Sequence, residues 1–291
     1  MKKDVIIQAR MGSTRLPGKV LKDLAGKPVL WHVIKRVKKA KLIDDIIIAT
    51  TTSKKDDDII KFCKKNNIKF YRGSEENVLE RYYETAKKYN SNIIIRVTSD
   101  CPLIDPHIID EILEFYMKNN YDLVTNAGSD LSKRTYPRGL DTEIFSYNIL
   151  KDSYREAKEK HQLEHVTPYI YENEYKIYYY KNKNDYSKYR LTLDTKEDYE
   201  LIKKVYDELY NGKHDFYLED IVDLMKKNEN LVKINQNNIQ KSVINLREVN
   251  KEDIKMLFDW VNDPLVRKNS FDPKQINWNT HKDWFNNSYK S

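Results

Sequence analysis

The first 130 residues alternate short apolar runs with amphipathic helical patterns, and this alternation limits the possible folds more than any other feature of the chain. Residues 5–7, 46–50 and 93–97 are apolar at nearly every position, which is typical of strands buried on both faces of a sheet. Between these runs, apolar residues recur every third or fourth position, as in the segment 30–37. The alternation predicts an α/β fold: a doubly wound, mainly parallel, Rossmann-like sheet with helices on both faces.

Further elements are predicted from weaker local patterns. Short strands are expected over 68–71, 175–180 and 189–193, an extended segment over 141–147, and helices over 150–160 and 164–172. The polar stretch 235–242 has no periodicity, and we expect it to be a linker. It separates a domain over residues 1–234 from a C-terminal part over 243–291.

A basic, glycine-containing loop follows the first apolar run. A strand, such a loop and then a helix form the arrangement with which α/β proteins hold an anion at the carboxyl edge of the sheet. The loop offers cations, flexible turns and hydroxyl donors that suit a polyphosphate: Arg10, Arg15, Lys19, Gly12, Gly18, Ser13 and Thr14. On composition alone, a basic surface loop with a turn at Pro17-Gly18 is the alternative.

Two familiar nucleotide loops do not fit this segment. A Walker A loop has four residues between its glycines and a Ser or Thr after the lysine, whereas five residues separate Gly12 from Gly18 and Val20 follows Lys19. The dinucleotide fingerprint G-x-G-x-x-G is also absent from the sequence.

The loop and the following segment 24–30 closely resemble the opening signature of the nucleotide-sugar cytidylyltransferases. The resemblance is strongest to the spore-coat polysaccharide branch of the acylneuraminate and keto-deoxy-octulosonate cytidylyltransferase superfamily. It implies a nucleotidyltransferase-type sheet and transfer of CMP from CTP to an acidic sugar of the nonulosonic keto-acid type, with release of pyrophosphate. The implied role is in cell-surface or spore-coat polysaccharide biosynthesis.

The resemblance assigns roles to the loop residues. Arg10, Arg15 and Lys19 are expected to act in catalysis by neutralising charge on the departing pyrophosphate. The implied nucleotide-binding residues of the loop are Gln8, Ala9, Arg10, Gly12, Ser13, Thr14, Arg15 and Lys19. The run 72–81 looks like a turn followed by a helix start, with Ser74 as a plausible cap. By resemblance it also serves the nucleotide, with Arg72, Ser74 and Asn77 recognising base or ribose.

Two aspartates follow strand-like runs and are candidate metal ligands. Asp100 comes after the run 93–97, and Asp194 comes after the predicted strand 189–193. Taken in isolation, each is better explained as a cap of the following helix, Asp194 especially. Both match the metal-site carboxylates of the superfamily, which implies a Mg²⁺ cofactor, because hard oxygen ligands suit magnesium.

A third set of residues is implied on the acceptor side: Arg138, Asp141, Glu143 and His165. Arg138 would pair with an acceptor carboxylate, and Asp141 would bind hydroxyls or assist as a base. A solvated loop is the equal alternative for the segment 138–143. His161 and His165 also fit the zinc-protease signature H-x-x-E-H, but Pro168 follows closely and the cytidylyltransferases carry a similar run without zinc.

Composition argues against several other classes of function. The formal net charge is +7, but lysines are interleaved with acidic residues, so no nucleic-acid partner is expected. No apolar run approaches the roughly 18 residues of a membrane helix, and no membrane contact is expected. Cys63 and Cys101 form no C-x-x-C pair, which favours a reducing, cytoplasmic location.

The C-terminal part resembles the start of a GNAT-type acetyltransferase, in the segments 246–247, 258–264 and 281–285. A strand is expected at 243–246 and a helix at 253–261. Because about fifty residues cannot bury a full core, we expect a truncated α+β fragment without transferase activity of its own.

Two alternative functions remain open from the sequence. One is nucleotidyl transfer from another NTP to a sugar phosphate, and the other is a non-catalytic nucleotide-sugar-binding protein. Relatives in the superfamily are often dimers, so a homodimer is expected.

Overall fold

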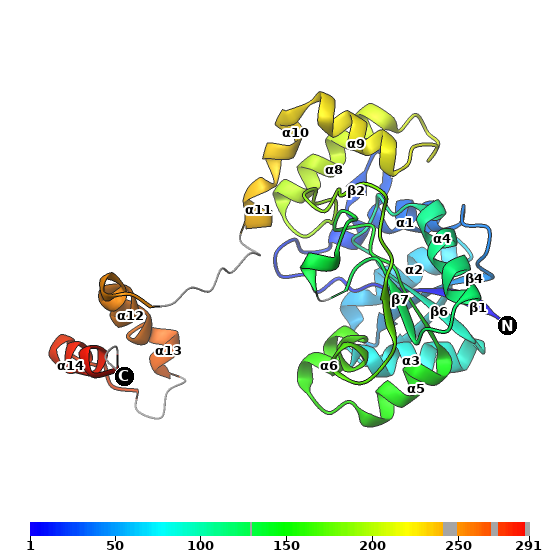
Figure 1. The fold of residues 1–291 in the computed structure, drawn as a ribbon. Coiled ribbons are helices and arrows are strands. Elements are labelled where there is room, and N and C mark those ends of the chain that lie inside the picture. The colour runs from blue at the N-terminus through cyan, green and yellow to red at the C-terminus, as the bar shows by residue number, and fades with distance from the viewer. Residues whose placement is uncertain (129, 241–248, 269–272, 289–291) are drawn as a thin grey trace. The chain divides into compact units, whose positions relative to one another are not determined.

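The computed structural model describes residues 1–128, 130–240, 249–268 and 273–288, in two compact units, Met1–Lys241 and Ser242–Ser291 (Figure 1). The predicted linker 235–242 is partly wrong, because helix α11 (Gln236–Gln240) belongs to the first unit. Asn235 is buried, and its Nδ2 donates to the carbonyl of Arg190 at 3.0 Å and to Asp198 at 2.9 Å. The strand expected at 243–246 lies outside the described residues.

A seven-stranded sheet forms the centre of the first unit, in the order β5-β4-β1-β6-β8-β7-β9. Only β8 runs antiparallel to its neighbours, so the predicted doubly wound, mainly parallel α/β sheet is confirmed. The strands are β1 (Lys3–Gln8), β4 (Asp45–Thr51), β5 (Lys69–Gly73), β6 (Ile93–Thr98), β7 (Leu123–Thr125), β8 (Glu143–Ser146) and β9 (Ile177–Tyr179). A small hairpin, β2 (Asp23–Leu24) with β3 (Lys27–Pro28), follows the basic loop.

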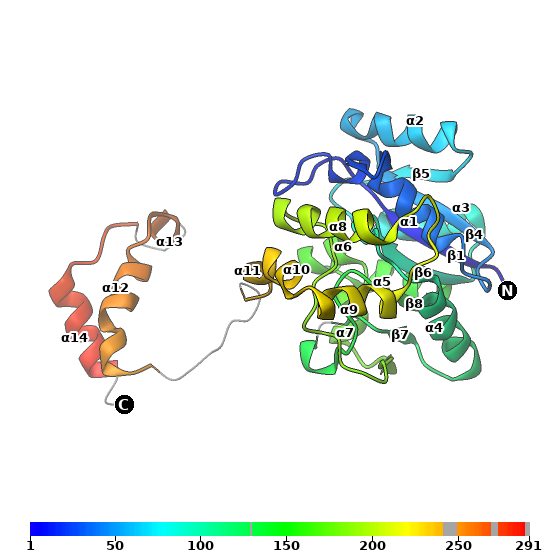
Figure 2. The ribbon, with the colours of Figure 1, turned by 90° about the horizontal axis from the view of Figure 1, so that it is seen from above.

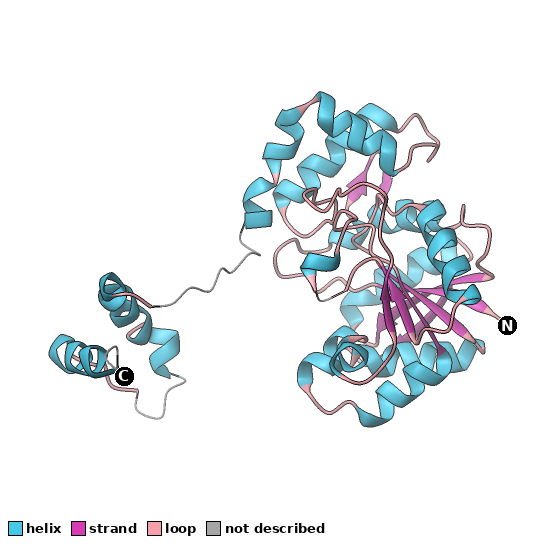
Figure 3. Ribbon diagram, in the orientation of Figure 1, coloured by secondary structure: helices cyan, strands magenta, loops and turns pink. Residues whose placement is uncertain are grey.

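Helices cover both faces of the sheet, as the ribbon shows (Figures 2 and 3). Val5 and Ile7 of β1 belong to one core cluster and Ile6 to the other, because successive strand residues point to opposite faces. The first face packs against α1 (Val29–Val37), α2 (Asp57–Lys65), α4 (Pro106–Lys118), α8 (Lys196–Leu209) and α9 (Leu218–Lys227). The second packs against α3 (Val78–Tyr89), α5 (Tyr147–Glu156), α6 (Lys160–His165) and α7 (Pro168–Glu172).

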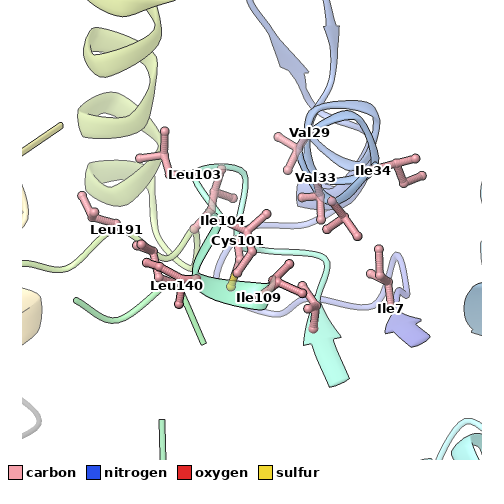
Figure 4. Close-up of a cluster of buried hydrophobic side chains, with 14 of the residues drawn as sticks. Ile7, Val29, Val33, Ile34, Cys101, Leu103, Ile104, Ile109, Leu140 and Leu191 are labelled. Carbon is pink, nitrogen blue, oxygen red and sulfur yellow. The ribbon is translucent and has the colours of Figure 1, made fainter. Parts of the chain in front are cut away.

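The predicted strand 189–193 is wrong, because this segment pairs with loops instead of a strand. The amide of Leu191 donates to the carbonyl of Arg138 at 2.7 Å, and the amide of Leu193 donates to the carbonyl of Asp100 at 2.9 Å. The only β-type pairing of this segment among the described residues is an isolated parallel bridge between Arg138 and Arg190. These two bonds tie the segment before α8 to the loop before β8 and to the loop after β6. Figure 4 shows Leu191 of this segment in one apolar cluster with Leu140, Leu103 and residues of α1.

The single helix predicted over 164–172 is two short helices, α6 and α7, separated at Val166. Val166 is fully buried and has a φ of 67°, a left-handed conformation that is rare for a β-branched residue. Pro168 begins α7 and has no amide hydrogen with which to continue the preceding helix.

The described residues of the second unit form a short 3-10 helix, η4 (Lys251–Asp253), and three α-helices, α12 (Ile254–Val261), α13 (Pro264–Lys268) and α14 (Trp278–Ser288). The helix predicted at 253–261 is therefore confirmed. Phe258 packs edge-on against Trp278, and a ring nitrogen of the buried His281 lies 3.0 Å from the carbonyl of Ile254. Throughout the part of the chain that the structure describes, no helix combines the length and apolarity needed to cross a membrane.

Candidate active site

The basic loop lies at the carboxyl edge of the sheet, where the strand order reverses. β1 is an inner strand, with β4, the next strand of this sheet along the chain, on one side and β6 on the other. The loop leaves β1 after Gln8, and Asp100 follows the parallel neighbour β6. In sheets of this kind ligands bind at such a switch point, so the fold itself places the loop and Asp100 at one site.

Lys19 links the two aspartates predicted as metal ligands. Its Nζ donates to Oδ2 of Asp100 at 2.7 Å and to Oδ1 of Asp194 at 2.8 Å, and its side chain is only 12% exposed. Burial alone would lower the pKa of Lys19, but the charges of Asp100 and Asp194 outweigh it, and the pKa is raised. The ammonium group of Lys19 therefore joins the basic loop to Asp194, which lies 175 positions later in the sequence.

Asp194 is held by three cations. Arg15 lies 3.3 Å from its Oδ1, and Arg190 donates to its Oδ2 at 2.9 Å. Burial would raise the pKa of Asp194, but Lys19, Arg15 and Arg190 together lower it. The capping explanation for Asp194 is wrong, because Thr195 caps α8: its hydroxyl accepts from the amide of Asp198, in a capping box.

Asp100 is likewise not a helix cap, since Asp105 caps α4 by accepting from the amide of His107 at 2.9 Å. Instead, Oδ1 of Asp100 accepts from the hydroxyl of Thr98 at 2.5 Å. Neither carboxylate of the pair caps a helix, and both line the same cavity.

The loop presents unused donors around this pair. Within the residues that the structure describes, the amides of Gly12, Thr14 and Arg15 donate to no protein acceptor. The amide of Met11 donates to Asp56 at 2.7 Å, and Gly18 turns the chain with a φ of 67°. The cavity measures about 320 Å³ and is lined by Gln8, Ala9, Arg10, Gly12, Ser13, Thr14, Arg15, Lys19, Val20, Val78, Arg81, Thr98, Ser99, Asp100, Glu164, His165 and Asp194.

The three residues of the run 72–81 that were predicted to recognise base or ribose do not line this cavity. The guanidinium of Arg72 donates to the carbonyls of Thr51 and Ser53 and pairs with Asp57 at 2.8 Å, so it serves the loop after β4. Ser74 is not the cap of α3; Asn77 is, because its side chain accepts from the amide of Glu80. Neither Arg72, Ser74 nor Asn77 is among the lining residues.

Arg81, on helix α3, also lines the cavity. It was not identified as a site residue from the sequence. It lies on the buried face of α3, three residues after Val78, and its Nη1 donates to the carbonyl of Ser74 at 2.6 Å. Burial lowers the pKa of Arg81, and the charge of Arg10 lowers it further. Its position among the apolar residues of the helical pattern could have identified it, because an arginine is rarely buried without a specific role.

A second cavity, of about 410 Å³, adjoins the first, and Thr98 and His165 line both. Of the residues predicted for the acceptor side, Asp141, Glu143 and His165 line this cavity and Arg138 does not. Both acids are paired, Asp141 with Arg134 at 2.6 Å and Glu143 with Arg96. The two arginines also line this cavity, and the other lining residues are Ala127, Gly128, Thr167, Pro168, Tyr171 and Glu172.

His165 occupies the junction of the two cavities at the end of α6. The strained residue Val166 follows it directly, and the carbonyl of His165 accepts from the amide of Thr167 at 2.8 Å. Strained backbone persists only where surrounding structure enforces it, and it gathers at functional sites.

Comparison with known proteins decides the family. A family model described as cytidylyltransferase matches residues 5–243. The chain belongs to the cytidylyltransferase family. It is an α/β enzyme of the CTP-dependent nucleotidyltransferase class, as the resemblance of the loop and the segment 24–30 implied.

Three relatives show how far this cytidylyltransferase resembles known members. The uncharacterised protein MJ1063 of Methanocaldococcus jannaschii is 39% identical, covering 84% of this chain and 98% of the relative. The spore coat polysaccharide biosynthesis protein SpsF of Bacillus subtilis is 35% identical, covering 77% and 93%. The structure of a cytidylyltransferase from Leptospira borgpetersenii is 36% identical with a TM-score of 0.75, covering 84% of this chain and all of that one, 100%.

In this cytidylyltransferase the pair of Asp100 and Asp194 fits a hard divalent cation. Both supply carboxylate oxygens, and one point, Lys19 Nζ, lies within 2.8 Å of an oxygen of each. Mg²⁺ needs only one or two carboxylates when substrate phosphates and water complete its shell, at about 2.1 Å. Among the described residues no group of three or more His, Cys, Asp or Glu side chains is placed to hold a metal, and the exposed His161 contacts Glu172.

Proposed function

We propose that the protein transfers CMP from CTP to a hydroxyl of an acidic sugar of the nonulosonic keto-acid class, with Mg²⁺ as cofactor. The acceptor oxygen bonds to the α-phosphorus, the bond from that phosphorus to the bridging oxygen breaks, and pyrophosphate leaves with the electron pair. The acceptor hydroxyl loses its proton to a nearby base or water. The meeting of Asp100, Asp194 and Lys19 beside the anion loop carries the proposal.

Each part of the first cavity has a role in this proposal. The free amides of Gly12, Thr14 and Arg15 bind phosphate oxygens, as in other loops at the end of a strand. Arg10, Arg15 and Lys19 neutralise the charge that develops on the leaving pyrophosphate. Asp100 and Asp194 would hold Mg²⁺, which supplies further charge stabilisation at the phosphates when bound.

We propose Arg138 as the partner of the acceptor carboxylate because of its charge state, although it lines neither of the two cavities. Its guanidinium is half-buried and makes no ion pair or side-chain hydrogen bond within the described residues, whereas Arg96 and Arg134 are paired. Burial lowers the pKa of Arg138, and so do the neighbouring charges of Arg134 and Arg190. A carboxylate from the acceptor would stabilise the charged form of Arg138 against burial and against these neighbouring cations. Asp141, Glu143 and His165 would accept or donate hydrogen bonds to its hydroxyls.

The decisive experiment is pyrophosphate release by the full chain with CTP, Mg²⁺ and a panel of keto-acid sugars. Release is expected with at least one acceptor, and the product should be a CMP-sugar. Failure with every acceptor, together with no detectable CTP binding, would contradict the proposal.

Two controls separate the alternatives. Asp100→Asn should abolish turnover while keeping the fold, whereas Asp58→Asn, at an exposed residue of α2, should leave turnover unchanged. A non-catalytic nucleotide-sugar-binding protein would show no turnover to lose. Because Arg72, Ser74 and Asn77 do not line the cavity, base preference needs its own test, a thermal-shift comparison of CTP, UTP, GTP and ATP.

The remaining predictions concern the whole chain. The resemblance of residues 243–291 to a GNAT-type acetyltransferase is still a prediction, and we expect no acetyl-CoA binding by this part. A homodimer, a cytoplasmic location and a role in cell-surface or spore-coat polysaccharide biosynthesis are likewise proposed, supported by the relationship to the spore coat protein SpsF.

A further inference from the structure

The carboxylates of the candidate metal site have all four oxygens engaged by side chains of the protein. Asp100 accepts from Thr98 on Oδ1 and from Lys19 on Oδ2, at 2.5 and 2.7 Å. Asp194 accepts from Lys19 on Oδ1 at 2.8 Å and from Arg190 on Oδ2 at 2.9 Å. The oxygens that face each other share one ammonium group, so a cation can bridge them only if Lys19 withdraws.

We infer that Lys19 is a displaceable counter-ion that closes the metal site until a nucleotide arrives, so that the divalent cation and the triphosphate bind together. The inference rests on the proposed function and adds an order of binding to it. It also gives Lys19 two successive partners, first the carboxylate pair and then the phosphates.

Electrostatics favour this exchange over simple competition by a free cation. Two carboxylates facing each other in a half-buried site repel, and the ammonium of Lys19 removes that repulsion. A free cation that displaced Lys19 would leave a mostly buried ammonium without an anionic partner, at a cost in desolvation. A triphosphate removes this penalty because it brings anionic oxygens to the same cavity.

The surroundings of Lys19 allow the exchange without refolding. Its amide is held by the carbonyl of Leu16 at 3.2 Å, in the short helix η1 (Lys19–Leu21), so the backbone keeps its place. A change of rotamer in the flexible four-carbon side chain can then turn the ammonium toward the loop. The unpaired amides of Gly12, Thr14 and Arg15 lie in the same cavity and attract the triphosphate there.

The test measures Mn²⁺ binding by the full chain without nucleotide, from the loss of the free-ion EPR signal. Lys19→Met keeps the apolar stem and removes the charge, so it should bind Mn²⁺ at least about tenfold more tightly than wild type. Lys19→Arg keeps the charge and should stay near wild type, and Lys19→Met combined with Asp100→Asn should lose the gain. Melting curves check folding, and Lys19→Gln replaces Lys19→Met if the latter does not fold.

A second arm adds a methylene-bridged CTP analogue that cannot release pyrophosphate, and wild type should then take up Mn²⁺. Absence of this uptake, with the nucleotide-free gain of Lys19→Met present, would leave Lys19 as the counter-ion of the pair but contradict joint binding of cation and nucleotide, and with it the proposed function. The inference is overturned if wild type binds Mn²⁺ without nucleotide as tightly as Lys19→Met does. It is equally overturned if removing the ammonium brings no gain, since the nucleotide-free arm does not depend on CTP.

Discussion

The guanidinium of Arg190 donates from Nη2 to Asp194 across 2.9 Å and also binds the fully buried carboxylate of Asp198 through Nε and Nη2. Asp198 in turn accepts from the amides of Asp194 and Thr195 and from Asn235. One buried ion pair therefore sets the orientation of a candidate metal ligand and ties the start of α8 to the segment before it. Arg190 acts through Asp194 and is a positioning residue.

Replacing Arg190 by Gln should destabilise the protein by about 3–5 kcal/mol, because Asp198 would stay buried without its ion partner. Denaturant unfolding followed by circular dichroism measures this loss. Arg190→Lys keeps the charge but not the two-pronged geometry, so it should keep most of the stability and lower kcat roughly 10–100-fold. A kcat for Arg190→Lys equal to that of wild type would show that Asp194 does not need this orientation.

Arg138→Met should weaken acceptor binding selectively. The unpaired guanidinium is proposed to receive the acceptor carboxylate, so its loss should raise the KM for the acidic sugar about tenfold or more. Steady-state kinetics measures this, and calorimetry should find the CTP affinity unchanged. Arg155→Met, at an exposed arginine of α5, is the matched control and should leave both values unchanged. An equal loss of CTP affinity in Arg138→Met would place this residue on the nucleotide instead.

Sequence reasoning succeeded where the signal was local. The buried strands β1, β4 and β6 are continuous apolar runs, and parallel pairing brings their carboxyl ends to one edge, which is why the loop and Asp100 could be expected together. It failed at residues 189–193, where the hydrogen-bond partners, the carbonyls of Arg138 and Asp100, lie 53 and 93 positions away.

The candidate site was predictable only in part, for a similar reason. Asp194 and Thr195 are both acceptable helix caps, and only the capping box with Asp198 decides between them. The partners Arg190 and Lys19 could not be assigned to Asp194 from spacing alone. Arg72 was expected at the nucleotide because of its position in a motif, but backbone carbonyls on the neighbouring strand end bind it.

Gly139 marks a close approach of two backbones next to the site, and Gly139→Ala should be strongly destabilising. Its φ is 102°, and a Cβ there would clash severely with the carbonyl carbon of Leu191 and lie 2.5 Å from the amide nitrogen of Thr192. Gly26→Ala is the matched control, because Gly26 has a φ of 80° with nothing near its Cβ position. The control should cost about 1 kcal/mol and Gly139→Ala more than about 3 kcal/mol, measured by chemical unfolding. Equal losses would mean that the Leu191 segment moves aside at little cost.

Two buried histidines should make the stability of the fold depend on pH. A ring nitrogen of His32, Nε2, lies 2.6 Å from the carbonyl of Leu24 and is therefore the protonated nitrogen. Its Nδ1 must then accept from Nε2 of His214, 2.9 Å away. Burial lowers the pKa of His32 to about 4 and that of His214 to about 3, and the nearby Arg36 adds to both shifts.

Both rings are thus neutral in the folded state and gain protons near pH 6.5 when the chain unfolds. Their contribution to stability is complete above pH 6.5 and is lost as the pH falls toward 4 and then 3. For His32 alone the loss is about 3 kcal/mol, at 1.36 kcal/mol per pKa unit. Urea unfolding between pH 7.5 and about 4 measures it. His214→Gln should flatten the slope, while His161→Gln, at an exposed histidine, should keep it. A wild-type slope that His214→Gln leaves unchanged would assign the acid sensitivity to carboxylates instead.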